Sequence, residues 1–135
     1  FEKFDAKKIS KYADDDVDRL MENRGIIRNR RKIESVINNA QKFLETKKEF
    51  GTFDSYIWSF TNYKTITNRF KNWDEIPATS EESELMSRDL KARGFKFVGP
   101  TVCYAFMQTI GMINDHVAGC FRRKEILMMP NFWEQ

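Results

Sequence analysis

The segment Arg93–Thr101, with the sequence RGFKFVGPT, constrains the fold of this 135-residue chain more than any other feature. Gly94 suits the left-handed conformation that ends a helix, and Gly99-Pro100 suits an N-cap followed by a first-turn proline. The segment therefore predicts a helix, a tight turn and a second helix. The amides that begin the second helix lack partners within it, so with the positive helix dipole they can hold a phosphate. This is the layout of a helix-hairpin-helix.

Two groups of residues are candidates for phosphate contacts. They are Arg93, Gly94, Lys96, Gly99 and Thr101 in the hairpin, and Arg28, Arg31 and Lys32 at the start of a helix predicted near residue 30. The alternatives are an ordinary corner between two helices and a solvated helix start, because glycine and proline mark many kinds of turn. These residues alone leave both interpretations open.

Apolar residues recur with a helical period along most of the chain. In the longest example, one helix face carries Ile33, Val36, Ile37, Ala40, Phe43 and Leu44, which predicts a helix from about Arg30 to Lys48. Shorter helices are predicted from the acidic run 14–16 to near Gly25, around 53–60, and from a capping box at Thr79 and Glu82 toward Arg93. Residues 62–77 are predicted to form a polar connection without a useful strand. The predicted fold class is all-α.

The helix predicted after Pro100 is apolar on nearly every side. Its apolar residues are Val102, Cys103, Ala105, Phe106, Met107, Ile110 and Met112. A helix of this kind is normally central and buried. We therefore expect it to anchor the hairpin, with Cys103 as a packing residue rather than a reactive thiol.

The overall composition excludes little. The chain has 23 basic and 20 acidic residues, a balance that does not by itself indicate nucleic acid. Two cysteines without a signal peptide favour a reduced, cytoplasmic setting over a disulfide framework. The apolar stretches are far shorter than the ~20 residues of a transmembrane helix, so no membrane partner is expected.

His116 and Cys120 form the sharpest chemical pair. On a helix, a spacing of four residues places imidazole and thiolate on one face, where both can bind one tetrahedral Zn²⁺. Two ligands do not complete a structural zinc site. From the spacing alone, a lone histidine beside an unrelated cysteine is the commoner explanation.

Four blocks of sequence carry a family resemblance. They are Gly25–Ile33 (GIIRNRRKI), Trp58–Phe60 (WSF), Glu75–Ser80 (EIPATS) and the segment Gly94–Cys120. In order and separation these blocks resemble the bacterial DNA-3-methyladenine glycosylase I family up to about Phe121. The resemblance implies a helix-hairpin-helix DNA glycosylase fold over residues 1–121. Residues 122–135 are expected to be a C-terminal tail, whose basic residues 122–124 either add surface charge or are disordered.

Family members carry several tens of residues before the point where this sequence starts, so the resemblance implies an N-terminally truncated chain and a partial fold. In the family that segment supplies the residues that recognise the methylated base and two of four zinc ligands. By resemblance, His116 and Cys120 are the other two ligands of a structural zinc ion in the full-length protein. This chain alone is expected to bind zinc weakly or not at all. The missing N-terminal segment is therefore an expected partner.

The resemblance also points to Asn114 and Asp115 as catalytic candidates. In the glycosylase superfamily an aspartate near this position stabilises the sugar cation or activates water. Asn114 occupies that position here, with Asp115 as the alternative carboxylate. The 3-methyladenine branch instead relies on a cationic, labile base. The structural alternative is that either side chain caps a helix at His116.

Tyr104 and Ala105 are expected at the edge of the base pocket. The family carries a tyrosine at the first position and commonly a serine at the second. Because Ala105 lacks the serine hydroxyl, the pocket edge is expected to differ here.

The sequence is therefore interpreted as the helix-hairpin-helix portion of a monomeric DNA glycosylase of the bacterial cytoplasm. It would bind double-stranded DNA with alkylated bases, flip out 3-methyladenine and hydrolyse its N-glycosidic bond in base excision repair. This chain alone is expected to be inactive. The alternative is a noncatalytic DNA-binding or zinc-dependent interaction module on the same scaffold, because a fold does not fix an activity.

Overall fold

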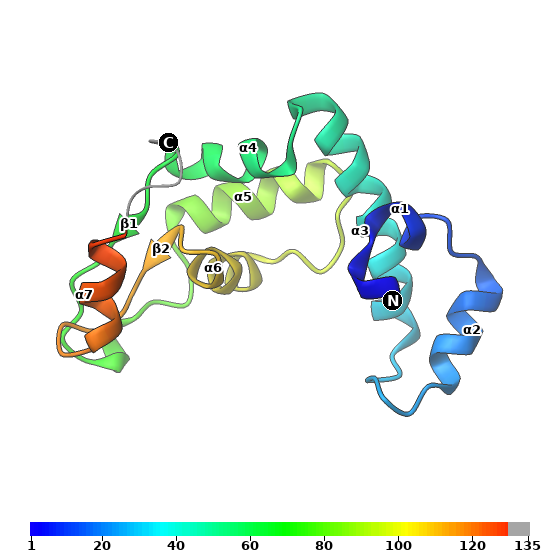
Figure 1. Cartoon of the computed structure of the whole chain (residues 1–135), viewed down its shortest axis with the longest axis horizontal. Helices are drawn as coiled ribbons and strands as arrows, with labels where there is room; N and C mark the ends of the chain where they lie inside the picture. The colour runs from blue at the N-terminus through cyan, green and yellow to red at the C-terminus, as the bar shows by residue number, and fades with distance from the viewer. Residues whose placement is uncertain (130–135) are drawn as a thin grey trace. The chain divides into compact units, whose positions relative to one another are not determined.

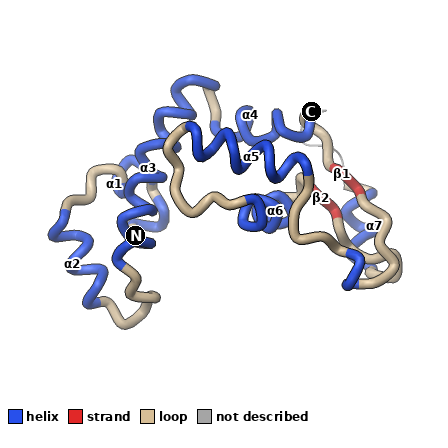
Figure 2. The backbone as a smooth tube through the Cα atoms, turned by 180° about the vertical axis from the view of Figure 1, so that it is seen from behind, coloured by secondary structure: helices blue, strands red, loops and turns tan. Residues whose placement is uncertain are grey.

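The computed structural model describes residues 1–129, which are mostly helical (Figures 1 and 2). The helices are α1 (Ala6–Ile9), α2 (Asp14–Glu22), α3 (Arg30–Phe50), α4 (Phe53–Trp58), α5 (Glu81–Ala92), α6 (Pro100–Thr109) and α7 (Phe121–Leu127). Short 3₁₀ segments lie at Glu2–Phe4, Ser59–Thr61 and Trp73–Glu75, and β1 (Ile66–Thr67) pairs with β2 (Ile113–Asn114). The predicted all-α class is confirmed, with the strand pair as a small departure. No described helix combines the length and the apolar content of a membrane span.

The chain forms two compact units. Phe1–Tyr56 and Asp89–Val98 make the first unit, and Ile57–Arg88 with the described residues from Gly99 on make the second. Residues 122–124 lie in α7 of the second unit, so they are helical rather than disordered. Residues 130–135 of the predicted tail lie outside the described residues.

Short polar side chains set the helix starts. The Asn29 side chain accepts the N–H of Lys32 at 3.2 Å and begins α3 where the sequence predicts it. The capping box predicted for α5 at Thr79 and Glu82 is wrong by one residue. Instead, the N–H of Ser83 donates to Ser80 Oγ at 3.2 Å, and the N–H of Ser80 donates to Ser83 Oγ at 2.8 Å. Two serines can cap each other in this way because each hydroxyl accepts one amide.

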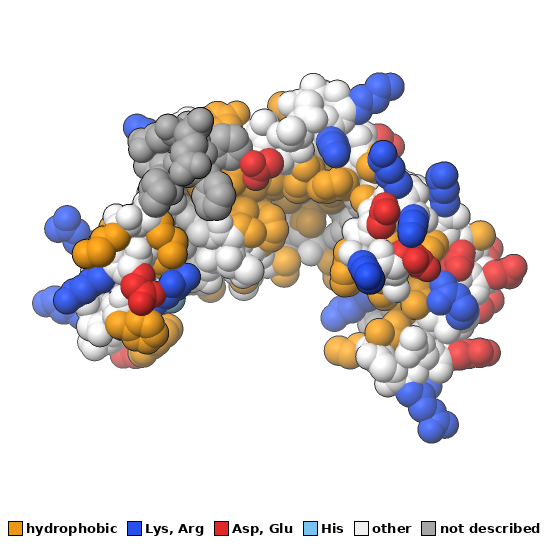
Figure 3. All heavy atoms as spheres, viewed as in Figure 1, with side chains coloured by type: hydrophobic (Ala, Val, Ile, Leu, Met, Phe, Trp, Pro, Cys, Tyr) orange, Lys and Arg blue, Asp and Glu red, His pale blue; other side chains and the backbone are white. Residues whose placement is uncertain are grey.

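The first unit is built on α3, against which α1 and α2 pack (Figure 1). Val17 and Leu20 of α2 meet Ile33 of α3 in a buried cluster. Ala40 is also buried, and the other residues of the predicted face are half-buried, so the core face predicted for α3 is confirmed. Basic and acidic side chains are intermixed over α1, α2 and α3, which agrees with the balanced composition (Figure 3).

Arg93, directly after α5, organises a second part of the first unit. Its guanidinium donates to Glu49 at 2.7 Å and to Asp89 at 2.9 Å. It also lies over the rings of Phe50 and Tyr56, at 4.8 and 4.9 Å from their centroids. The Tyr56 hydroxyl donates to Asp89 at 2.6 Å. Burial raises the pKa of Tyr56, and its bond to Asp89 raises it further. Arg93 therefore ties the end of α3 to the last turn of α5.

The second unit contains the strand pair and α6. Ile66 pairs with Ile113 and Thr67 with Asn114 in parallel register (Figure 2). The N–H of Ile66 also donates to the carbonyl oxygen of Met112 at 2.8 Å. These bonds fix the segment that follows α6 against residues 66–68, and this segment carries the predicted catalytic and metal-ligating residues.

The expectation that α6 is a central, buried helix holds for only part of its surface. Cys103, Tyr104 and Met107 are buried, and Cys103 is a packing residue as expected. Val102 and Phe106, in contrast, are 58% and 39% exposed. They recur at a spacing of four residues and so share a different face, which is partly open to solvent.

The acid sensitivity of the first unit should depend on Asp89. Burial opposes ionisation of this carboxyl group, but the hydrogen bonds from Tyr56 and Arg93 outweigh burial and hold its pKa below the ordinary 3.8. A carboxyl group whose pKa is lower in the folded than in the unfolded protein stabilises the folded state at pH values above the unfolded-state pKa. This stabilisation is lost as the pH falls through the folded-state pKa. We expect Asp89→Asn to lower stability at neutral pH and to flatten its decline below about pH 4.

Urea unfolding of both proteins at neutral and acid pH measures this effect. Asp74→Asn, which changes an exposed carboxylate of the second unit, is the control and should follow the wild-type curve. Parallel pH curves for Asp89→Asn and the wild type would contradict the assignment.

Candidate functional site

Two asparagines of α3 hold the turn that follows α5. Asn38 Nδ2 donates to the carbonyl oxygen of Gly94 at 2.9 Å. Asn39 donates from Nδ2 to the carbonyl oxygen of Lys96 and accepts the Lys96 N–H at Oδ1, each at 2.8 Å. Gly94 has the predicted positive φ, +89°. The backbone of this turn is therefore fixed within the first unit, while the Lys96 side chain is exposed.

The start of α6, in the second unit, has the predicted form. Gly99 is the N-cap, with φ −64° and ψ 162°, and Pro100 is the first helical residue. Gly99, as the N-cap residue, has no side chain that could accept a hydrogen bond from the first turn of α6. The first-turn amides, including that of the exposed Thr101, therefore have no side-chain cap. This helix start meets the requirement for an anion contact made by backbone N–H groups.

The other predicted phosphate contacts differ in how available they are. Arg28, Arg31 and Lys32 are exposed and form no ion pair among the described residues. Arg93 is different, because its guanidinium is already bonded to Glu49 and Asp89. A phosphate contact by Arg93 would have to compete with two carboxylates.

His116 and Cys120 meet in a turn. The expectation that they share a helix face is wrong, because residues 115–120 are not helical and α7 begins only at Phe121. Asn114 Oδ1 accepts the N–H of His116 at 3.2 Å, and the N–H of Cys120 donates to the carbonyl oxygen of Val117 at 2.9 Å. This local bonding turns the chain directly after β2 and replaces the predicted helix.

The turn still brings the two side chains together, with His116 Nδ1 and Cys120 Sγ 3.7 Å apart. Nitrogen and sulfur ligands of one tetrahedral zinc ion lie about 3.6 Å apart when each bond is ~2.0–2.3 Å. The pair therefore fits half of a zinc site. Within residues 1–129, no group of three or more histidine, cysteine, aspartate or glutamate residues is placed to complete it.

Asp115 is a buried carboxylate with three donors. It accepts the amide of Asn68 at 2.7 Å, the amide of Gln108 at 2.9 Å and the hydroxyl of Tyr104. Burial raises the pKa of Tyr104, and the bond to Asp115 adds to the shift, so the phenol remains a donor. Among the described residues no cation lies within salt-bridge distance of Asp115. The hydrogen bonds to this carboxylate therefore come from neutral groups alone.

Asn114 is buried and only 2% exposed. Its Oδ1 accepts the N–H of His116, whereas its Nδ2 has no hydrogen-bond partner among the described residues. The alternative that Asn114 or Asp115 caps a helix at His116 is wrong, because no helix starts there.

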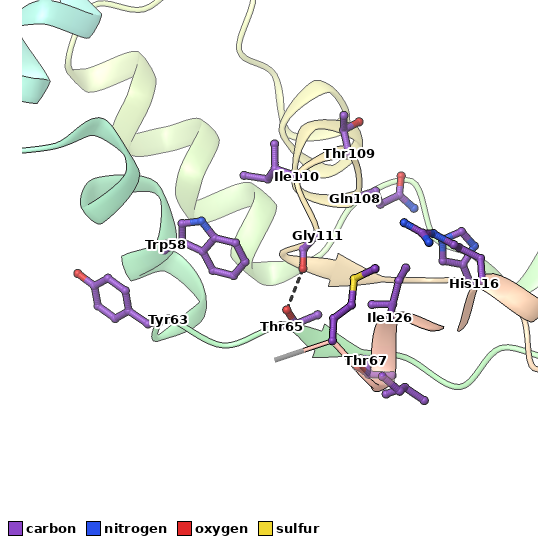
Figure 4. A pocket seen from close by; sticks show the side chains of 13 residues that line it. Trp58, Tyr63, Thr65, Thr67, Gln108, Thr109, Ile110, Gly111, His116 and Ile126 are labelled. Carbon is purple, nitrogen blue, oxygen red and sulfur yellow. Dashed lines mark hydrogen bonds between the residues drawn. The ribbon is translucent and has the colours of Figure 1, made fainter. Parts of the chain in front are cut away.

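Two pockets of the second unit adjoin these residues. The α7 pocket, of about 490 Å³, is lined by Trp58, Tyr63, Thr65, Thr67, Gln108, Thr109, Ile110, Gly111, His116, Arg122, Ile126, Leu127 and Met129 (Figure 4). The Trp73 pocket, of about 380 Å³, is lined by Trp73, Ile76, Ala105, Gln108, Thr109, Ile113, Asp115 and His116. The predicted residues Ala105 and Asp115 thus line the Trp73 pocket, whereas Asn114 and Tyr104 line neither pocket.

The methyladenine glycosylase family profile matches residues 1–123. The chain belongs to the methyladenine glycosylase family. It is 42% identical over 120 residues to DNA-3-methyladenine glycosylase 1 of Escherichia coli (strain K12), and 43% identical over 120 residues to DNA-3-methyladenine glycosylase of Haemophilus influenzae. Each alignment covers 89% of this chain but only 64% and 65% of the relatives, so the chain spans less than two thirds of their length.

Solved structures of methyladenine glycosylases have the same fold. A crystal structure of 3-methyladenine DNA glycosylase I is 41% identical, with a TM-score of 0.87 over 90% of this chain and 66% of that chain. A variant of 3-methyladenine DNA glycosylase I in complex with 3-methyladenine is 29% identical, with a TM-score of 0.88 over 91% of this chain and 66% of that chain. The predicted family and the predicted glycosylase fold are confirmed.

Sequence reasoning missed several residues that shape these sites. Asn38 and Asn39 lie in the middle of a long helix and looked like ordinary polar positions. Gln108 lies within the Gly94–Cys120 block but was assigned no role, and Trp73 lies outside all four blocks. The positive signal available was weak: adjacent asparagines are poor helix formers, so a pair of them in a helix interior suggests bonds outside the helix.

Proposed function

We propose that the chain is the helix-hairpin-helix part of a DNA glycosylase that removes 3-methyladenine from alkylated DNA. The family match over residues 1–123 carries this proposal. One matched structure contains 3-methyladenine, which supports that base as the substrate. The noncatalytic alternative is not favoured, because both curated relatives bear the name of the enzyme. The enzyme acts as a monomer in the bacterial cytoplasm, where the genomic DNA lies.

The chemistry that such a site must perform is modest. The glycosidic bond is inaccessible inside the stacked duplex, so the damaged nucleotide is flipped out, which costs least for a damaged base. Methylation at N3 gives the attached adenine a positive charge and makes it a good leaving group. Binding that favours the separating sugar cation and base over the intact nucleotide then lowers the barrier to attack by water. No lysine nucleophile is needed.

Backbone amides and basic side chains make the DNA contacts. The α6 start with Gly99 and Thr101 binds one phosphate, and Lys96 adds charge beside the turn that contains Gly94. Arg28, Arg31 and Lys32 bind phosphates from the start of α3. Arg93 acts mainly by holding its turn, because its guanidinium already bonds Glu49 and Asp89.

The base occupies the Trp73 pocket, beside Ala105. Asp115 provides a negative charge at its wall, and Tyr104 supports that carboxylate from behind. Asn114 contributes by turning the chain after β2 rather than by direct contact with the base. The residues that complete base recognition come from outside these 135 residues, in the additional length that the relatives possess.

His116 and Cys120 bind a structural zinc ion in the complete protein. Their 3.7 Å separation supports this assignment, and the remaining ligands lie outside the described residues. Zinc at this position would tie the turn after β2 to another part of the protein. Its contribution is to stability, since neither side chain is assigned a chemical step.

Release of free 3-methyladenine from methylated duplex DNA tests the proposed activity. The complete gene product should release the base, whereas the 135-residue chain alone should not, because a partial pocket loses differential binding of the transition state. Chromatography of the released bases measures both. Full release by the 135-residue chain would contradict the partial pocket, and no release by the complete gene product would contradict the proposed function.

Lys96→Glu should weaken binding to all duplex sequences alike. Removing one phosphate contact should reduce the slope of log K against log salt concentration by about one unit. Because a phosphate contact does not distinguish bases, the base preference should stay unchanged. Binding titrations over a range of salt concentrations measure this. Lys7→Glu on α1 is the control, since it makes the same charge change at another exposed lysine of the first unit. Equal losses in both variants would refute a specific role for Lys96.

Cys120→Ala should lower the zinc content and the melting temperature of the complete gene product, because one of the metal's ligands is removed. Elemental analysis and thermal unfolding measure the two effects. Cys103→Ala is the control, because Cys103 is buried in α6 and its loss should leave the zinc content unchanged. Absence of zinc from the wild type in every preparation would rule out the assignment.

A further inference from the structure

We propose that the ring of Phe97 packs against a deoxyribose of the DNA backbone, beside the phosphate that Lys96 contacts. This inference rests on the proposed function, because it requires the turn after α5 to bind duplex DNA. Phe97 lies in the first unit, directly after Lys96, and is 54% exposed. Phe97 is thus a further DNA-binding residue, and its contribution does not depend on charge.

The backbone of Phe97 has an unfavourable conformation. Its φ is +59°, in the left-handed region where the Cβ of an L-residue lies too close to the following carbonyl oxygen. A bulky residue is rare there, whereas a glycine such as Gly94 adopts a positive φ without this cost. Strained residues persist where the surrounding structure holds them, and they are concentrated in binding and active sites. The conformation of Phe97 therefore indicates that its side chain has a function.

The chain just before Phe97 is firmly held. Asn39 binds both the N–H and the carbonyl oxygen of Lys96, each at 2.8 Å. Phe95 is only 9% exposed, and the centroid of its ring lies 6.1 Å from that of Phe53. One phenylalanine of the turn thus anchors it within the first unit, while the other is left half open to solvent. Packing within the unit explains Phe95 but does not explain why a strained position carries a second large aromatic ring.

The position beside Lys96 selects the part of DNA that this ring can meet. Neighbouring Cα atoms lie about 3.8 Å apart, so the Phe97 ring and the Lys96 ammonium group can reach the same stretch of DNA backbone. Between consecutive phosphates that stretch offers a deoxyribose, whose carbon atoms form an apolar surface. An apolar contact gains free energy with the area removed from water, and it releases no counterions. The ring should therefore add affinity that salt does not weaken.

Phe97→Ala and Phe97→Gly both remove the ring, and they differ from each other in backbone freedom. Binding of the complete gene product is measured over a range of salt concentrations, on an undamaged duplex rich in TA steps and on an undamaged A-tract duplex. Both variants should bind each duplex about tenfold more weakly at every salt concentration, with the wild-type slope of log K against log salt concentration. Phe4→Ala is the control, because Phe4 is a 75% exposed phenylalanine of the same unit, and it should bind as the wild type does.

Thermal unfolding of the same two variants tests the strain. Phe97→Gly should melt about 3 °C higher than Phe97→Ala, because glycine adopts the positive φ freely. A merely structural role would give another pattern, since the more stable glycine variant would then regain binding relative to the alanine variant. Equal losses of binding at different stabilities thus separate the ring from the backbone. If the alanine variant does not fold, the glycine variant still decides the ring contact.

Wild-type affinity in both variants, or recovered binding in Phe97→Gly alone, would overturn the ring contact. A slope reduced by about one unit would overturn it too, because the change would then act through Lys96. A loss confined to the TA-rich duplex would replace the deoxyribose contact by insertion between bases, since TA steps unstack most easily. Equal melting temperatures would overturn the strain. Failure of the proposed function is a different result, namely a wild type that releases no 3-methyladenine from methylated DNA.

Discussion

The buried carboxylate of Asp115 is the constraint on which the second unit depends. It gathers donors from the loop after β1, at Asn68, and from two turns of α6, at Tyr104 and Gln108. A buried charge is tolerated only when hydrogen bonds replace its water, so each donor must stay in place. The bond from Asn68 also joins the segments that follow β1 and β2, beside the backbone bonds of the two strands. The carboxylate at the pocket wall therefore also contributes to the local structure of the second unit.

In the first unit, neutral side-chain amides provide hydrogen-bond partners for the backbone of a turn. A turn between helices leaves backbone N–H and C=O groups that need partners. The amides of Asn38 and Asn39 supply them from the side of α3, and the bonded pair at Lys96 resembles one rung of a sheet. Arg93 adds charged bonds and ring contacts beside the same turn. The lysine side chain can then remain exposed without loosening its backbone.

Local sequence patterns predicted the positions of the helices well, but they could not predict contacts between more distant residues. The period of α3, the acidic start of α2 and the Gly94 and Gly99 positions depend on neighbours within a few residues, and all appear as expected. Cap selection was wrong by one residue because Thr79 and Ser80 are equally good candidates by composition. The burial of α6 was overestimated, since hydrophobic content shows that a face can be buried and not whether another element covers it. Asn39, Gln108 and the network of Asp115 depend on contacts across 57, 7 and 47 residues of sequence.

The pair His116 and Cys120 shows how a correct proximity can follow from a wrong backbone. A spacing of four residues brings side chains together on a helix, but a turn that closes with an i to i+3 bond does the same. The two geometries differ in what keeps the two side chains together. A helical pair would be rigid on its own, whereas this turn depends on Asn114 and on the carbonyl oxygen of His116, which accepts from Arg123 at 3.2 Å. A metal ion bound there would therefore stabilise the exit from β2 and, through Asp115, the wall of the pocket.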